Sequence, residues 1–155
     1  MKKALQQYDI LVISLASPFL VGLYEDNILI KEWSSDEKIS EALLTIITSI
    51  SNNFNISRTI YTRGPGSHMA TKLTYLMLKT IEISMNIECF GCSGFEFSKD
   101  KPIKAIGNLY FVKEKETIIT KKFDEPIDSG FVLPINLNSI ELDLSSEPLH
   151  LLPSV

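Results

Sequence analysis

The five residues from Arg63 to Ser67, Arg-Gly-Pro-Gly-Ser, are the residue types in this chain best suited to binding an anion. Gly64 and Gly66 permit positive φ angles and a close approach of the backbone, and Pro65 stiffens the turn. Free amides at the start of a following helix could cradle a phosphate group. The residues alone favour a simpler interpretation, a tight strand-to-helix turn with Ser67 as the helix N-cap. The stretch matches neither a Walker loop nor a dinucleotide-binding glycine motif.

Cys89 and Cys92 form a Cys-x-x-Cys pair inside a predicted strand over residues 88–93. Strand side chains alternate, so these two thiols should point to opposite faces of the sheet. No second Cys-x-x-Cys or histidine cluster completes a zinc site. We therefore interpret both cysteines as small buried hydrophobic residues. Two cysteines are too few for a disulfide framework and favour a reducing compartment, the cytoplasm.

The other titratable side chains give weaker signals. Ser67 and His68 are neighbours in the sequence, which does not place a hydroxyl and an imidazole in the geometry of a catalytic triad. His68 could contact an anion at the glycine loop or act as a base, but a surface or packing role is the better interpretation. Asp124, Glu125 and Asp128 lie in a proline-containing loop, which a solvated turn explains better than a metal site.

The composition restricts the class of protein. The chain has 155 residues, of which 45% are hydrophobic and 22% are charged, and its formal net charge is −4. This length fits one domain, or one domain with a small appendage, and the composition excludes intrinsic disorder and a disulfide mini-scaffold. The chain has no basic run, so tight autonomous binding of nucleic acid is not expected. Its longest apolar run, residues 10–24, is too short and too interrupted for a membrane span.

Three short strands are predicted at the start of the chain, over residues 9–16, 19–24 and 28–33. The first is an apolar, β-branched run, typical of a central strand that is covered on both faces. Glu25-Asp26-Asn27 predicts a turn between the second and third strands. We expect the three strands to form an antiparallel meander.

Two helices are predicted next to these strands. The first begins within residues 34–37, where Ser and Asp suit an N-cap, and one apolar stripe follows at helical spacing as far as Ile50. The second, from about Ser67 to Met85, is apolar around most of its circumference. Such a helix is either sandwiched inside the fold or has part of its surface against another protein.

The remaining strands are predicted at 58–62, 88–93, 105–112 and 117–123, and the tail from residue 124 should form short strands and loops. Three strands, a helix, a strand, a helix and a strand predict a mixed sheet with helices packed on it. This is the element order of the ribonuclease H-like fold, which actin-like ATPase domains share. The expected fold class is therefore α/β, a ribonuclease H-like or actin-like ATPase-type mixed sheet, with a β-rich C-terminal lobe.

The stretch Tyr-Thr-Arg-Gly-Pro-Gly-Ser at residues 61–67, followed by an apolar helix, resembles the TsaB (YeaZ) family. Members typically read Y-x-R-G-P-G-S-F-T-G-x-R-x-G and later carry a strand that ends near G-V-S-x-L. The stretch F-G-C-S-G-F at 90–95 falls at that second position, and I-L-V-I-S-L-A-S at 10–17 aligns with the family's I-L-A-I-D-T-A-T. The resemblance covers about residues 9–97.

Several residues depart from the family pattern. The family's first-strand Asp is Ser14 here. In actin-like ATPases that Asp helps to hold the metal and phosphate, and a neutral hydroxyl is a poor substitute for a carboxylate ligand. We therefore expect no independent ATP hydrolysis and no enzymatic activity. The other substitutions are Leu15 for Thr, Lys38 for the usual His, His68-Met69-Ala70 for F-T-G, and Thr74, Leu76 and Leu78 for small glycines of the second helix.

The resemblance also implies a domain organisation. Residues 1–97 correspond to the TsaB-like N-terminal domain, and residues 98–155 to a C-terminal lobe shorter than the family's usual second domain. Glu147-Pro148-Leu149-His150-Leu151 resembles the family's terminal E-P-x-Y-L stretch, so the chain is expected to be complete and minimal.

By this resemblance, the chain is a non-catalytic partner subunit in the threonylcarbamoyladenosine modification of tRNA. Such proteins dimerise or bind the catalytic TsaD subunit through their two N-terminal helices, and the ATPase TsaE joins the assembly. tRNA is reached only through the complex, no membrane is involved, and a nucleotide is expected only at a partner interface. The residues expected at the helical interface are Ile39, Leu43, Ile46, Ile47, Ile50, Met69, Leu73, Leu76, Met77 and Thr80.

Two alternatives remain open at this stage. One is a small enzyme that holds phosphate or a nucleotide in the Arg63–Ser67 loop. The other is a homodimer of altered function, since Lys38 and His68 replace typical family residues. Association with TsaD distinguishes the subunit from both.

Overall fold

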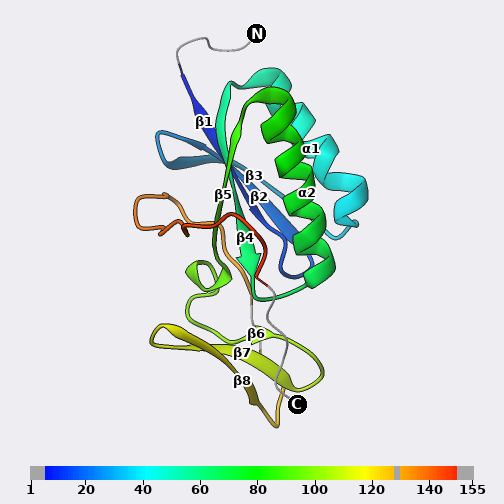
Figure 1. The fold of residues 1–155 in the computed structure, drawn as a ribbon, viewed down its shortest axis with the longest axis vertical. Coiled ribbons are helices and arrows are strands. Elements are labelled where there is room, and N and C mark those ends of the chain that lie inside the picture. Colours follow the sequence, from blue (N-terminus) through cyan, green and yellow to red (C-terminus); the bar gives the residue numbers. More distant parts are fainter. Residues whose placement is uncertain (1–5, 128–129, 150–155) are drawn as a thin grey trace.

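Strand β1 (Tyr8–Ile13) lies at the centre of a mixed sheet in the computed structural model, which describes residues 6–127 and 130–149. The strand order in this sheet is β3-β2-β1-β4-β5. β2 and β3 pair in antiparallel fashion, as the predicted meander requires, whereas β1–β4 and β4–β5 are parallel (Figure 1). The other strands of the sheet are β2 (Phe19–Glu25), β3 (Ile28–Ser35), β4 (Ile56–Gly64) and β5 (Glu88–Ser93).

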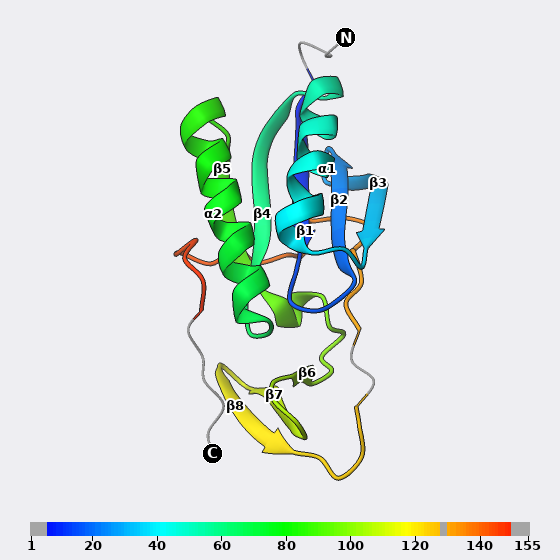
Figure 2. The same ribbon diagram turned by 90° about the vertical axis from the view of Figure 1, so that its right-hand side faces the viewer.

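Helices α1 (Ile39–Asn53) and α2 (His68–Met85) both cover one face of this sheet (Figure 2). The apolar stripe of α1 is buried, and its residues pack with Ile10 and Val12 of β1 and with Leu78 of α2 in one hydrophobic core. Burying a large aliphatic side chain of this kind contributes about 1.5–3 kcal/mol. The predicted order of strands and helices through β5 is confirmed.

The opposite face of the sheet is covered by the tail, not by helices. Leu133 and Leu137 are buried against Leu11, Ile13 and Ile60 in a second core. Two contacts fix this segment, since the Tyr24 hydroxyl donates to the Pro134 carbonyl at 2.8 Å and the Leu29 amide donates to the Ile135 carbonyl at 2.8 Å. β1 is therefore covered on both faces, as its apolar composition predicts.

A second sheet, β6-β7-β8, lies beyond the far end of the first (Figures 1 and 2). It comprises β6 (Ile103–Lys104), β7 (Leu109–Glu114) and β8 (Thr117–Lys122), and follows the 3-10 turn η1 (Gly94–Glu96). Phe95, Ile103 and Phe111 form its small core. The strand predicted over 105–112 begins four residues too early, because Gly107 adopts a φ of +58° in a tight turn that separates β6 from β7, while its pairing with the next strand is confirmed.

The predicted start of the first helix within residues 34–37 is also wrong. Ser34 and Ser35 belong to β3 and pair with Leu20 and Phe19 of β2, so the sheet ladder holds them in extended backbone. α1 begins at Ile39, and its N-cap residue Lys38 makes no side-chain capping hydrogen bond. Within the described residues, neither helix is long and apolar enough to cross a membrane.

Candidate functional site

The glycine loop packs against the turn that follows β1. Gly64 and Gly66 have φ angles of +140° and +155°, a region that L side chains rarely adopt. A Cβ atom on Gly66 would lie 2.7 Å from the Leu15 Cβ, so this position requires glycine on two counts. The Ser67 amide donates to the Leu15 carbonyl at 2.9 Å. The expected N-cap is confirmed, because the Ser67 hydroxyl accepts a hydrogen bond from the Ala70 amide.

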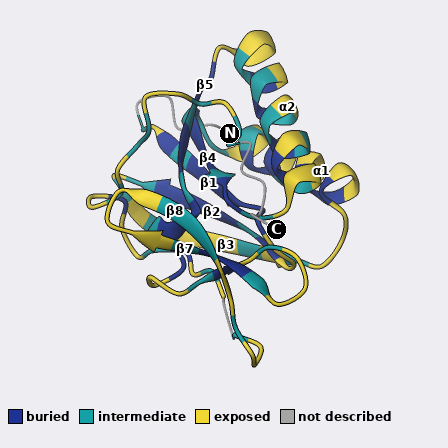
Figure 3. Ribbon diagram, turned by 60° about the horizontal axis from the view of Figure 1, so that its bottom comes forward, coloured by how far each residue is buried: buried dark blue, intermediate teal, exposed yellow. Residues whose placement is uncertain are grey.

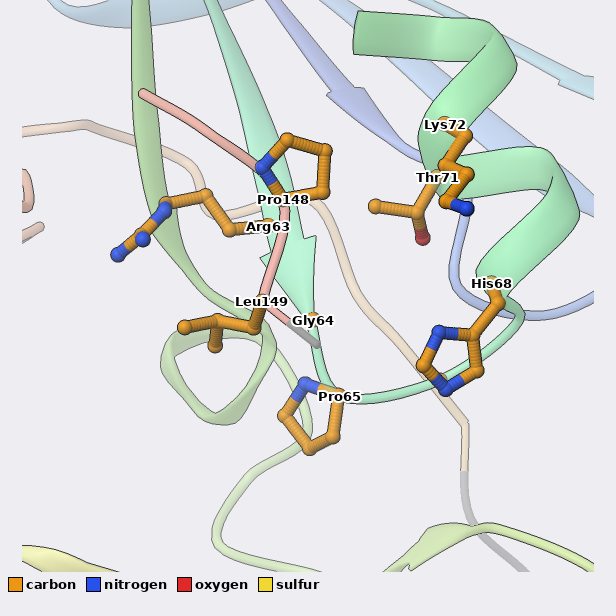
Figure 4. Close-up of a pocket in the computed structure, with 9 residues that line it drawn as sticks. Arg63, Gly64, Pro65, His68, Thr71, Lys72, Pro148 and Leu149 are labelled. Atoms are coloured by element: carbon orange, nitrogen blue, oxygen red, sulfur yellow. The ribbon is translucent and has the colours of Figure 1, made fainter. Parts of the chain in front are cut away.

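Arg63 points away from the loop and holds the tail. Its Nε donates to the Glu147 carbonyl at 2.5 Å, and its guanidinium pairs with the Asp143 carboxylate at 2.7 Å. Figure 4 shows the side chain extended away from His68 and Lys72. The guanidinium of Arg63, the cation within the loop itself, is thus already paired with a carboxylate of the same chain.

The space beside the loop is also small. The cavity lined by the loop, Thr71, Lys72 and Pro148 has a volume of about 10 Å³, enough for about one water molecule (Figure 4). Small-molecule sites typically measure about 300–1,000 Å³. In this conformation the Arg63–Ser67 loop serves as a strand-to-helix turn, the simpler of the two interpretations of its sequence.

Ser14, which directly follows β1, is buried and tied to α2. Its hydroxyl lies 2.8 Å from the Thr74 hydroxyl, which also donates to the Ala70 carbonyl at 2.8 Å. The two hydroxyls therefore join the end of β1 to the inner side of α2.

The two cysteines lie on opposite faces of the sheet, which confirms the prediction from strand alternation. Cys89 belongs to the core under the helices and Cys92 to the core under the tail. Burial raises the pKa of both thiols above the ordinary value. No group of His, Cys, Asp and Glu side chains within the described residues is arranged to hold a metal ion.

The residues that the sequence predicted at a helical interface fall into two groups, one buried against the sheet and one exposed. The sheet-facing side of α1 is buried, and it carries Ile39, Leu43, Ile47 and Ile50. Ile46 is partly buried against the same core. On α2, Leu73 and Met77 are partly buried, whereas Met69, Leu76 and Thr80 are exposed. The outward side of α1 is mostly polar, with exposed Thr45, Thr48, Ser49 and Asn52 around Leu44.

An apolar line remains uncovered on α2. Met69, Leu76 and Ile83 are 70%, 60% and 85% exposed and follow one another at intervals of seven. Leu73 and Thr80 lie between them, which gives the alternating 4-3 spacing of a helix-packing seam. We name these five residues the docking stripe. Figure 3 shows exposed residues along the outward sides of both helices.

Ile83 is the member of the docking stripe that sequence reasoning missed. The spacing 69, 73, 76, 80 predicts 83 as the next position, so the signal was present. The second helix is thus not sandwiched inside the fold, and its excess apolar surface faces outward.

A larger hollow of about 510 Å³ opens where the two helices begin. Its walls come from the turn after β1, including Ser14, from Phe19 at the start of β2, and from residues 36–40 before and within α1. Met69 and Leu73 of the docking stripe form the third wall. The hollow is therefore continuous with the stripe and extends the uncovered surface toward Lys38.

Two solved structures share this fold. YeaZ from Pseudomonas aeruginosa matches with a TM-score of 0.57 and 7% identity, over 76% of this chain and 65% of that chain. A structure described as an uncharacterized protein with similarity to peptidase YeaZ from Pseudomonas aeruginosa matches with a TM-score of 0.58 and 8% identity, over 79% of this chain and 71% of that chain. The match thus spans slightly less than two thirds of the first protein. No protein-family model and no curated protein matches the sequence.

Proposed function

We propose that this chain is a divergent TsaB-like subunit that binds and supports the catalytic TsaD subunit in threonylcarbamoyladenosine modification of tRNA. In this proposal residues 1–97 form an actin-like ATPase-type domain, residues 98–155 form a reduced C-terminal lobe, and the protein acts in the cytoplasm. TsaE joins the same assembly, and tRNA contacts the complex rather than this subunit alone.

Two independent features support the family relationship. The Tyr61–Ser67 motif is a resemblance in amino-acid sequence, whereas the similarity to YeaZ is a resemblance of the backbone fold. Both point to the same family. The motif also lies between β4 and α2, where the chain passes from a strand to a helix.

The observation that carries the partner role is the docking stripe. Large apolar side chains exposed together on one side of a helix are typical of protein interaction sites. Met69, Leu76 and Ile83 are each more than half exposed, and each would contribute up to about 1.5–3 kcal/mol if a partner buried it fully. The 4-3 spacing matches packing against another helix at a shallow crossing angle.

Two further contacts support a non-catalytic role. By the resemblance, Ser14 stands where an actin-like ATPase carries a carboxylate, and its hydroxyl is engaged by Thr74, while Arg63 of the glycine loop is engaged by Asp143. A nucleotide, if one is present in the assembly, would therefore lie at the interface with the partner. We propose no cofactor for the isolated chain.

The test is to mix the purified chain with TsaD of the same organism and to measure mass by light scattering after size exclusion. We expect a one-to-one complex. Leu76→Asp should weaken it at least tenfold, because a charge in a buried helix seam remains unpaired. Ile106→Asp is the matched control, since Ile106 is 68% exposed in the turn before β7.

Two results would overturn the proposal. A stable homodimer that does not associate with TsaD would favour the homodimer of altered function. Equal losses of TsaD binding in Leu76→Asp and Ile106→Asp would remove the docking stripe as the interface. In both experiments circular dichroism must show the native helix content of each variant.

A further inference from the structure

The segment Asp143–Leu149 connects the tail on one face of the sheet with helix α2 on the other. At its start the Asp143 amide donates to the Gly91 carbonyl of β5 at 2.8 Å. At its end the Leu149 amide donates to the Arg63 carbonyl of β4 at 2.9 Å. The segment therefore crosses the ends of two adjacent strands. We name it the clasp.

Two side chains of β4 hold the clasp between these ends. Arg63 contacts it twice, through the Asp143 carboxylate and the Glu147 carbonyl, and the Tyr61 hydroxyl donates to the Ser146 carbonyl at 2.5 Å. Arg63 can lie flat across β5 only because residue 91 is glycine, since a Cβ there would collide with the Arg63 side chain. The Tyr and Arg of the Tyr-x-Arg-Gly-Pro-Gly-Ser motif thus bind a peptide segment of the same chain.

The attachment of the clasp is almost entirely polar. None of its seven residues is buried, and Leu144 is fully exposed. By contrast, Leu133 and Leu137, earlier in the tail, are buried in the core. Segments with few buried apolar contacts open locally at a lower free energy than the core. The clasp therefore has fewer buried apolar contacts to lose on opening than the part of the tail that contains Leu133 and Leu137.

The clasp also lies against α2, the helix that carries the docking stripe. The Tyr61 ring packs against the Tyr75 ring of α2, with centroids 5.9 Å apart. Glu147 and Pro148 face Lys72, Tyr75 and Leu76 across a hollow of about 310 Å³. Leu76 belongs to the docking stripe, so the seated clasp forms a wall directly beside the proposed partner surface.

We propose that the clasp seats and unseats as a unit with Arg63 as its lock, and that only the seated clasp completes the surface around Leu76 that a partner helix contacts. The second half of this proposal rests on the proposed function. The first half concerns the isolated chain and stands without it. The clasp is a conformational device that links the end of the β4 strand to the docking helix.

Hydrogen exchange on the full chain, followed by mass spectrometry, tests the lock. We expect peptides covering residues 143–149 to exchange at least tenfold faster in Arg63→Gln and in Asp143→Asn than in the wild type, while β1 peptides do not change. Arg58→Gln is the matched control, because Arg58 pairs with Asp9 at 3.0 Å elsewhere on β4. Asp143→Asn provides a second variant in case Arg63→Gln does not fold.

The lock is overturned if the clasp peptides of the wild type exchange only as slowly as those of β1, or if Arg63→Gln leaves their exchange unchanged. The link to docking is tested by the affinity for TsaD, which we expect to fall several-fold in Arg63→Gln and not in Arg58→Gln. Unchanged affinity in Arg63→Gln, with faster clasp exchange, overturns the link. A wild type that does not bind TsaD refutes the proposed function instead, and leaves the exchange result to decide the lock.

Discussion

The hydroxyls of Ser14 and Thr74 lie 2.8 Å apart although 60 positions separate them in the sequence. Ser14 directly follows the central strand, and Thr74 lies on the inner side of α2, where both side chains are buried. The contact joins the end of β1 to α2 through two neutral hydroxyls. A carboxylate placed at residue 14 would therefore meet an environment built for neutral groups.

We predict that Ser14→Asp destabilises the protein by about 3 kcal/mol or more, because Ser14 is buried and its side-chain partner is the neutral Thr74 hydroxyl. Urea unfolding followed by circular dichroism measures this difference. The double variant Ser14→Ala with Thr74→Val is the control, because removing both hydroxyls leaves no unpaired polar group and should cost about 1 kcal/mol or less. Equal losses in the two variants would contradict the account.

We predict that Gly66→Ala costs roughly 2–4 kcal/mol, from backbone strain and from overlap with Leu15. Gly107→Ala is the matched control. Gly107 also has a positive φ, of +58°, but no atom lies within 4 Å of its added Cβ. It should therefore lose only about 1 kcal/mol from the backbone strain. Thermal unfolding of both variants decides whether the close approach to Leu15 matters, and identical midpoints would exclude it.

Glu82 gives a prediction on pH. The Cys89 amide donates to the Glu82 carboxylate at 2.7 Å, and Lys79 pairs with it at 2.9 Å. Both contacts lower the pKa of Glu82, and the hydrogen bond from the Cys89 amide has the larger effect. A carboxyl whose pKa is lowered by folding stabilises the protein above its unfolded pKa, near 4.3, and loses this contribution as pH falls through the folded pKa.

Glu82→Gln should therefore be less stable than the wild type at pH 7, by about 1 kcal/mol or less because solvent screens the site. The difference should shrink as the pH falls below about 4. Chemical unfolding at a series of pH values measures it. Glu116→Gln, at the exposed turn between β7 and β8, should show no such trend. A wild-type advantage that grows in acid would contradict the sign.

The thiols give a fourth prediction. Cys89 and Cys92 are buried, and burial raises the pKa of each, so little reactive thiolate forms in the native state. At pH 8 a soluble aromatic disulfide reagent should label neither thiol within minutes, and both within seconds in denaturant. Rapid labelling of the folded protein would show that one strand face opens readily to solvent.

Local pattern was sufficient for much of the fold. Residues 88–93 form β5 with the predicted bounds, and the helical spacing of the apolar residues correctly predicted both helices. The start of α1 was not accessible from local pattern, because Ser34 and Ser35 are good capping residues that pairing with β2 holds in the strand. Tertiary pairing outweighs a capping preference worth about 1 kcal/mol.

The candidate site was harder to predict, because its contacts join distant parts of the chain. An apolar stripe on α1 fits the chain's own sheet as well as a partner, and the structure assigns it to the sheet. From the sequence alone, Arg63 is a plausible ligand for an anion. Its pairing with Asp143, 80 positions away, becomes visible only in the folded structure. The tail also lies far from the sheet in the sequence, and its lack of periodicity suggested only short strands and loops. Its role in covering one face of the sheet was therefore not predicted.

The covering of the sheet by the tail has a consequence for biosynthesis. A ribosome makes β1 to β5 and both helices well before it makes Leu133 and Leu137. Until then Leu11, Ile13 and Ile60, all fully covered in the finished protein, face solvent on one side. The nascent chain therefore holds a half-covered sheet for the seconds needed to add about forty more residues, at about 5–20 residues per second. During that interval its bare face is exposed apolar surface of the kind that makes folding intermediates prone to aggregate.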